Sequence, residues 1–308
     1  MAPRAEPGGA SLGLLSSIAA PPFYLGLPLW SHQRWSGTLY RSGSKAGDFL
    51  RQYAQVFQCV EGNTTFYATP SRETLIKWRA QTPASFRFML KFPKRITHEL
   101  DLEGAALHEA RAFIEHLSPV WDRLGPILLQ LPPKLSPRSL SALERFLAGL
   151  REGPRPELRF AVEARHWDFF DPDRGGETLH LLLSRYEGER VIMDTRPLQS
   201  AESPYDAATR EALERKPKRP VWPFALGAHP TVRFVSHPRV ESNQRWLSQW
   251  AEQVVRWVRE GRRPYFFVHH PGEDLAPEIA AYFYSMIQEP LGLDPLPSWP
   301  GRAQGELF

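Results

Sequence analysis

Short apolar runs recur along this chain at intervals of 27 to 41 residues, and polar residues follow nearly every run. The runs are rich in branched and aromatic residues and have the length of strands buried on both faces. They predict eight strands. These are Tyr24–Leu29, Cys59–Asn63, Phe86–Leu90, Ile127–Leu131, Arg159–Glu163, Arg190–Asp194, Thr231–Val235 and Tyr265–His269.

The segments between these runs carry the marks of helices. Thr69-Pro70-Ser71 predicts a helix start, with proline at the first helical position before Glu73–Ala80. Ser136-Pro137 repeats this pattern ahead of an apolar stripe at helical spacing. Ser242–Glu260 is amphipathic, and Gly261 after it is a typical stop signal.

Eight alternating strand and helix units predict an α/β protein with one domain, a TIM-like (β/α)8 barrel. An open doubly wound sheet usually has a glycine-rich phosphate turn after its first strand, and none follows the first run here. We expect the barrel to span residues 22–292, with a long excursion at 197–228. Residues 1–21 are expected to be a disordered arm and 293–308 a flexible tail.

Composition narrows the class of protein. The hydrophobic fraction of 42% fits a folded globular chain, and no apolar run approaches the roughly 18 residues of a membrane span. The formal charge of +4 favours an anionic substrate or weak contact with nucleic acid. A single cysteine, Cys59, excludes a disulfide framework and fits a reducing cytoplasm.

Ionisable side chains directly after buried strands are costly unless they face a cleft. In a barrel, all eight carboxyl-terminal strand ends meet at one opening, here called the mouth, where barrel enzymes hold their chemistry. The chain therefore predicts a site built from several strand ends. Its candidates are Glu61, Asn63, Thr64, Tyr67, Lys91, His98, Gln130, Glu163, Arg165, His166, Asp194, Arg196, Arg233 and His269.

Four of these candidates are predicted to be catalytic: Glu61, Lys91, Glu163 and Asp194. Glu61 and Glu163 would divide the roles of general acid and base. Lys91 would form a Schiff base if desolvated, or hold an anion. The same charges would also be explained by an ion-pair network that fills the polar top of the barrel.

The remaining candidates are predicted to bind substrate. Glu163 and Arg165 share one face of their strand, and His166 points the other way, so His166 is the one most expected to be structural. Arg165 and Arg196 would hold an anion, and His98 or His166 would transfer protons.

No cofactor is predicted, because the sequence contains no Walker-type loop, nucleophile elbow or nucleotide fingerprint. A divalent metal would need Glu61, Glu163, Asp194 and His269 to converge on it. Neighbouring arginine and lysine residues would compete for those carboxylates and argue against the metal.

The last five residues, Gln304-Gly305-Glu306-Leu307-Phe308, resemble the Gln-x-x-Leu-Phe peptide by which bacterial replication and repair proteins dock on the DNA sliding clamp. In that mode Leu307 and Phe308 would enter an apolar pocket while Gln304 makes hydrogen bonds at its rim.

Several longer stretches resemble the YecE-like family, known as domain of unknown function seventy-two, over roughly residues 23–290. The resemblance implies a TIM-like barrel, a cytoplasmic setting and no settled activity. The matching stretches are Val60–Tyr67, Phe86–His98, Leu129–Pro133 and Val162–His166, with weaker matches at Val191–Arg196 and Ala276–Glu278.

Three functions remain open at this point. The first is a cytoplasmic enzyme, a hydrolase, lyase or isomerase, that acts by acid–base chemistry on a small anionic substrate such as a sugar phosphate. The second is a nucleic-acid processing or repair factor that docks on the sliding clamp. The third is a barrel that binds a ligand without catalysis.

Overall fold

Eight parallel strands form one sheet in the computed structural model, which describes residues 20–203 and 205–305. The sheet order is β3-β2-β1-β8-β7-β6-β5-β4. Its two end strands meet through isolated bridges, Phe88 with Leu124 and Lys91 with Leu128, so the sheet is nearly closed into a barrel. The strands are β1 (Tyr24–Leu27), β2 (Cys59–Gly62), β3 (Arg87–Leu90), β4 (Ile127–Gln130), β5 (Phe160–Glu163), β6 (Glu189–Asp194), β7 (Thr231–Val235) and β8 (Tyr265–His269).

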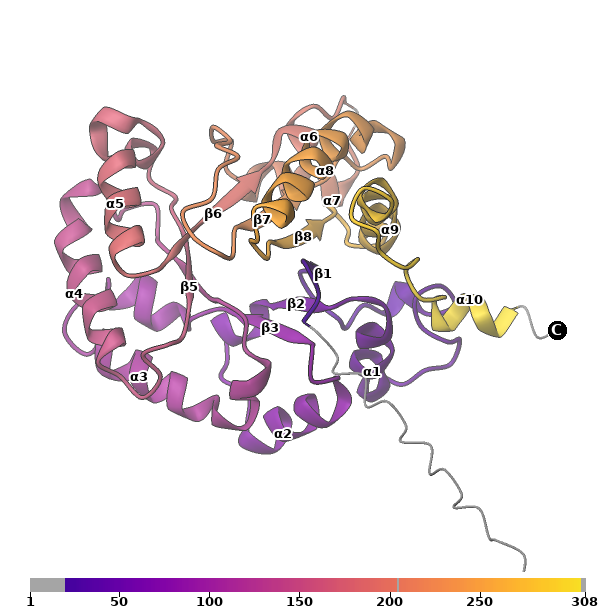
Figure 1. Ribbon diagram of the computed structural model, residues 1–308, viewed down its shortest axis with the longest axis horizontal. Coiled ribbons are helices and arrows are strands. Elements are labelled where there is room, and N and C mark those ends of the chain that lie inside the picture. The colour runs from indigo at the N-terminus through magenta and orange to yellow at the C-terminus, as the bar shows by residue number, and fades with distance from the viewer. Residues whose placement is uncertain (1–19, 204, 306–308) are drawn as a thin grey trace, which may run out of the picture.

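The α/β class, the TIM-like barrel and all eight strands are confirmed, with strand ends shifted by at most two residues. Helices surround the strands (Figure 1). They are α1 (Ala46–Val56), α2 (Arg72–Gln81), α3 (Ala106–His116), α4 (Leu140–Arg151), α5 (Glu177–Arg185), α6 (Arg196–Gln199), α7 (Ala207–Arg215), α8 (Gln244–Arg259), α9 (Ala276–Gln288) and α10 (Pro300–Gly305).

The start of α2 differs from the prediction. Pro70 is not the first helical residue; instead Ser71 is the N-cap, and its side chain accepts a hydrogen bond from the Thr74 backbone N–H at 3.2 Å. A serine hydroxyl satisfies one of the unpaired N–H groups of the first turn, which fixes the boundary one residue after the proline.

The inside of the barrel is filled by a small apolar layer that is separate from the main core between strands and helices. Because strand side chains alternate, the residues two positions further along these strands must also point inward, toward the mouth. The layer consists of Tyr24, Cys59, Met89, Leu128, Ala161, Val191, Tyr265 and Phe267.

The excursion at 197–228 contains α7. The described residues beyond 292 pack against the barrel in part. Trp299 is only 6% exposed, and Gly301, in the first turn of α10, lies close to the backbone of Thr38 and Tyr40. This differs from the flexible tail predicted for 293–308, since an aromatic anchor fixes its middle. The arm predicted at 1–21 falls almost wholly outside the described residues, as do Leu307 and Phe308.

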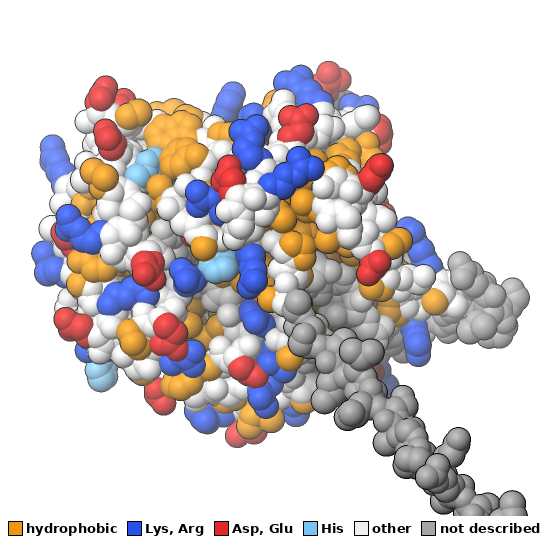
Figure 2. All heavy atoms as spheres, viewed as in Figure 1, with side chains coloured by type: hydrophobic (Ala, Val, Ile, Leu, Met, Phe, Trp, Pro, Cys, Tyr) orange, Lys and Arg blue, Asp and Glu red, His pale blue; other side chains and the backbone are white. Residues whose placement is uncertain are grey.

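No helix in the described part of the chain is long and apolar enough to cross a membrane. Side chains of both charge signs cover the face seen in Figure 2.

Candidate functional site

A cavity of about 630 Å³ opens at the mouth of the barrel. It is lined by the ends of β1, β2, β3, β4, β5, β7 and β8, together with α7 from the excursion. Predicted site residues from six strand ends line it: Glu61, Asn63, Thr64, Tyr67, Lys91, Gln130, Arg165, Arg233 and His269.

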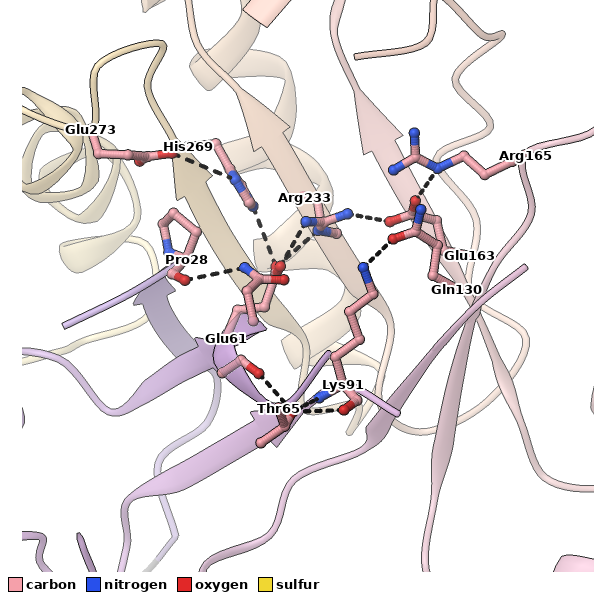
Figure 3. A network of polar contacts seen from close by, with 12 residues as sticks. Pro28, Glu61, Thr65, Lys91, Gln130, Glu163, Arg165, Arg233, His269 and Glu273 are labelled. Carbon is pink, nitrogen blue, oxygen red and sulfur yellow. Dashed lines mark hydrogen bonds and ion pairs between the residues drawn. The ribbon is translucent and has the colours of Figure 1, made fainter. Parts of the chain in front are cut away.

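Buried ion pairs form a network at the mouth, and Arg233 lies at its centre (Figure 3). Its Nε and Nη2 donate to the two carboxylate oxygens of Glu61 at 2.8 and 2.6 Å, and its Nη1 donates to Glu163. All three side chains are buried, and they come from β7, β2 and β5. Charged groups persist in a protein interior only when they are paired and well hydrogen-bonded, as Arg233 and its two carboxylates are here.

This network keeps both carboxylates ionised. Burial alone would raise the pKa of Glu61, but Arg233 and His269 outweigh it and hold that pKa well below its usual range. Burial likewise opposes ionisation of Glu163, yet Arg165, Arg233 and Lys91 lower its pKa to about 2. Neither group therefore has a proton to donate near neutral pH.

His269 connects this network to a third carboxyl group, that of Glu273. Its Nε2 lies 3.3 Å from Glu61, and its Nδ1 lies 4.0 Å from Glu273. Burial lowers the pKa of His269 to about 4, so its imidazole is neutral at pH 7. Burial has the opposite effect on Glu273 and raises the pKa of its carboxyl group, which accepts the His270 backbone N–H at 3.2 Å.

Lys91 follows β3 and reaches into the cavity, with 7% of its surface exposed. Its Nζ donates to Gln130 and lies 3.6 Å from the ring centroid of Phe66. Its backbone N–H donates to the Thr65 hydroxyl at 3.0 Å, which fixes the chain at this point. Within the described residues, Lys91 has no carboxylate within 4.0 Å, and burial lowers its pKa to about 8.

Two more cations face the cavity. Arg165 donates through Nε to Glu163, as the shared strand face predicted, and its backbone oxygen accepts two bonds from Arg219. Lys216 follows α7, and burial lowers its pKa. In the described structure no carboxylate forms an ion pair with Lys216.

The rim of the mouth is built by the turn after β2. The Asn63 amide donates to the Pro28 carbonyl at 3.2 Å and joins this turn to the end of β1. Thr64 lines the cavity beside it, and Tyr67 is 83% exposed at the edge. An exposed aromatic ring next to buried cations is suited to cover a polar ligand.

Asp194 and Arg196 were predicted at the mouth, and the structure places them elsewhere. Asp194 is fully buried on the outer face of β6, where it accepts bonds from Trp250 Nε1 at 2.8 Å and Arg196 Nη2 at 2.7 Å. Val191 belongs to the inner layer, so the inward positions of β6 are odd-numbered and Asp194 faces the helices. The predicted catalytic position of Asp194 is therefore wrong.

His98 and His166 also lie outside the cavity lining. His166 Nδ1 accepts the Asp168 backbone N–H at 3.2 Å and caps the turn Trp167–Phe170, in keeping with the structural role favoured for it. His98 lies behind the cavity wall, with its ring edge-on to Phe66 at 5.2 Å.

Lys216 and Glu273 are not among the site residues predicted from the sequence. Lys216 lies in the basic run 215–219, whose position in the excursion was the only signal for it. Glu273 is four residues beyond β8, in a turn where it adopts a positive φ of 58°. Neither residue lies on a strand, so the alternation of strand side chains could not predict that they face the cavity.

No group of three or more metal-binding side chains is arranged to hold an ion in residues 20–203 and 205–305. The carboxylates at the mouth are already occupied by Arg233, Arg165 and His269. A cation would have to displace these partners, which leaves anions as the ligands that the mouth suits best.

Comparisons of sequence and of structure lead to one family. The family model "Protein of unknown function DUF72" matches residues 24–301. UPF0759 protein YecE of Escherichia coli K12 is 36% identical over 268 residues, which cover 87% of this chain and 93% of that protein. A DUF72 family protein of Thermotoga maritima MSB8 has a TM-score of 0.64 at 24% identity, covering 86% of this chain and 99% of its own. Another from Enterococcus faecalis V583 has a TM-score of 0.64 at 18% identity, with 88% and 96% covered.

Proposed function

This chain belongs to the DUF72 family, as its strand-end motifs indicated, and we propose that it is an enzyme that performs acid–base chemistry on a small anionic substrate. One observation carries the proposal. Lys91, Arg165 and Lys216 line a single cavity, and of these three only Arg165 forms an ion pair in the described structure, with Glu163. A cation that is wholly or partly buried without a partner is costly, and an anionic ligand would offset that cost.

The charge of the cavity supports an anion. Its lining contains five lysine and arginine residues against three glutamates. Two of those glutamates are already paired, Glu61 with Arg233 and Glu211 with Arg215. A cavity of about 630 Å³ with a few convergent polar groups has the size of a metabolite site, such as one for a sugar phosphate.

Different charged groups of the site bind the substrate and transfer protons. Arg165 and Lys216 bind the anionic group of the substrate, and Arg233 holds Glu61 and Glu163 in place as fixed anions. Proton transfer belongs to Lys91 and Glu273, because burial moves their pKa values from opposite directions toward neutral pH. The acid and base roles predicted for Glu61 and Glu163 pass to these two residues.

A ligand screen with paired variants tests this function. Arg165 and Arg196 each follow a carboxylate by two residues and pair with it, but only Arg165 lines the cavity. In isothermal titration with sugar phosphates and small carboxylates, Arg165→Gln should weaken binding by roughly 10- to 100-fold, the value of one charge-assisted bond. Arg196→Gln should leave binding unchanged.

Each outcome has a clear meaning. Equal losses in both variants, or preference for neutral analogues over phosphates and carboxylates, would refute an anion site at the mouth. Tight binding without turnover of any bound ligand would favour the alternative of a ligand-binding barrel that performs no reaction.

We also propose a second role, docking on a DNA sliding clamp through the peptide that contains Gln304, Leu307 and Phe308. What supports it is the position of α10, which extends away from the barrel (Figure 1). Clamp binding at micromolar concentration should vanish when Leu307 and Phe308 become alanine and persist in Lys91→Arg. Weak contact with nucleic acid would accompany clamp docking. The enzyme role and the clamp role would both be performed in the cytoplasm, and a free, buried Cys59 is in keeping with that compartment.

A further inference from the structure

We propose that the Lys91 amine is a nucleophile that forms an imine with a carbonyl carbon of the substrate, so that the substrate class is a small anionic aldehyde or ketone. This inference rests on the proposed function and deepens it. It assigns to Lys91 a covalent step in addition to proton transfer.

The position of Lys91 is that of a held, desolvated amine. It directly follows β3, and its backbone N–H and C=O both contact the Thr65 hydroxyl, at 3.0 and 2.6 Å. Phe66 covers the amine on one side, and Gln130, whose amide oxygen carries no charge, receives its hydrogen bond. A rigid, partly apolar setting of this kind orients a nucleophile and removes water from it.

Other lysines of the described chain lack this combination. Lys94 is exposed three residues further along, and Lys134 is paired with Asp101 at 2.8 Å. Lys216 faces the same cavity but comes from the excursion rather than from a strand end. Lys91 is thus the strand-borne amine of the cavity that lacks a carboxylate partner among the described residues.

The lowered pKa of Lys91 leaves part of its amine neutral, and only the neutral amine can attack a carbonyl carbon. Burial, together with the charges of Arg233 and Arg165, lowers the pKa of Lys91 to about 8, against the opposing pull of Glu163 and Glu61. About one amine in ten is then neutral at pH 7, compared with roughly one in three thousand for an ordinary lysine. Arg165 and Lys216 would hold the anionic end of the substrate within the same cavity.

The step balances without any further reagent. The neutral amine adds to the carbonyl carbon, a C–N bond forms, and the π pair of the C=O bond moves to oxygen. A proton passes from the nitrogen to that oxygen and gives the neutral carbinolamine. The hydroxyl group then takes up one further proton, the C–O bond breaks to release water, and the nitrogen lone pair forms the C=N bond of the protonated imine. Glu273, whose carboxyl group lines the cavity, is the proton donor for the departing oxygen.

Reductive trapping tests the inference on the full-length protein. The probes are pyruvate, glyoxylate and dihydroxyacetone phosphate, each incubated with protein and sodium borohydride. Peptide mass spectrometry should find Lys91 heavier by the probe mass less one oxygen. Labelling of Lys91 should exceed that of exposed Lys94 at least tenfold and should increase between pH 7 and pH 9, as the amine loses its proton.

Two variants and a binding measurement complete the design. Lys91→Arg keeps the charge but cannot form an imine, so labelling in the cavity should disappear, whereas Lys134→Arg, outside the cavity in a surface ion pair with Asp101, should retain it. Thermal-shift titration with the same probes reports binding separately. Binding without trapping at Lys91 overturns the imine and leaves the proposed function standing; neither binding nor trapping overturns both. Labelling that is equal at Lys91 and Lys94 also overturns the imine.

Discussion

Arg233→Met is the substitution that tests the mouth most directly. Methionine has nearly the volume of the arginine stem but carries no charge, so it removes the partner of two buried carboxylates, Glu61 and Glu163, without leaving a large cavity. The variant should remain folded but lose much of its stability at neutral pH.

The expected loss in the free energy of unfolding follows from the ion pairs of Arg233. The pKa of Glu163 lies at about 2 instead of 4.5, and each pKa unit is worth about 1.4 kcal/mol, so its ionised form is stabilised by about 3 kcal/mol. Arg233 supplies part of this for Glu163, and it supplies the strongest attraction for Glu61. Removing one partner of a buried pair typically costs about 3–5 kcal/mol, and we expect a loss in that range.

The pH dependence has opposite signs in the two proteins. In the wild type, the folded pKa of Glu163 is below its unfolded value, so its stabilisation is present above about pH 4.5 and is lost as the pH falls toward 2. In Arg233→Met, Arg233 no longer offsets burial, which would raise the pKa of Glu61 most and that of Glu163 less, because Arg165 and Lys91 still lie beside Glu163. The variant should therefore gain stability, relative to wild type, as the pH falls from 7 to 5.

Urea unfolding at pH 7 and pH 5, followed by circular dichroism, measures both effects. The triple variant with Glu61→Gln and Glu163→Gln added to Arg233→Met should recover at least half of the loss, because the two carboxylates that Arg233 paired with are then replaced by uncharged amides. A loss under 1 kcal/mol, an equal loss at both pH values, or no recovery in the triple variant would refute the reasoning.

Three further substitutions probe other parts of the barrel. Arg190→Met should change the free energy of unfolding by less than about 1 kcal/mol or increase it in urea titration, because this buried guanidinium contacts aromatic rings and has no carboxylate partner among the described residues. Gly26→Ala should cost about 2–3 kcal/mol in the same assay, because its Cβ would lie 2.2 Å from the Cys59 carbonyl oxygen. Asp194→Asn should lower stability by about 1–2 kcal/mol yet leave reductive labelling of Lys91 unchanged, since Asp194 faces α8; reduced labelling would contradict that placement.

The strands were predictable because each is an apolar run that ends in polar residues, but a run that is apolar on both faces does not reveal which positions point inward. On β5 the assumption of a shared face for Glu163 and Arg165 was right. On β6 the same reasoning placed Asp194 in the mouth, whereas Val191 sets the inward positions one residue away. Lys216 reaches the mouth from an excursion, where no periodicity predicts its direction.

The apolar layer inside the barrel explains why the mouth has unusual chemistry. Five of its eight residues are followed, two residues later, by a polar side chain of the network, as Met89 is followed by Lys91. The same relation holds for Cys59 and Glu61, Leu128 and Gln130, Ala161 and Glu163, and Phe267 and His269. The polar ring therefore stands on a floor that excludes water from below. Ligands and solvent reach it through the cavity above, and burial, to which this floor contributes, is the main cause of the lowered pKa of Lys91.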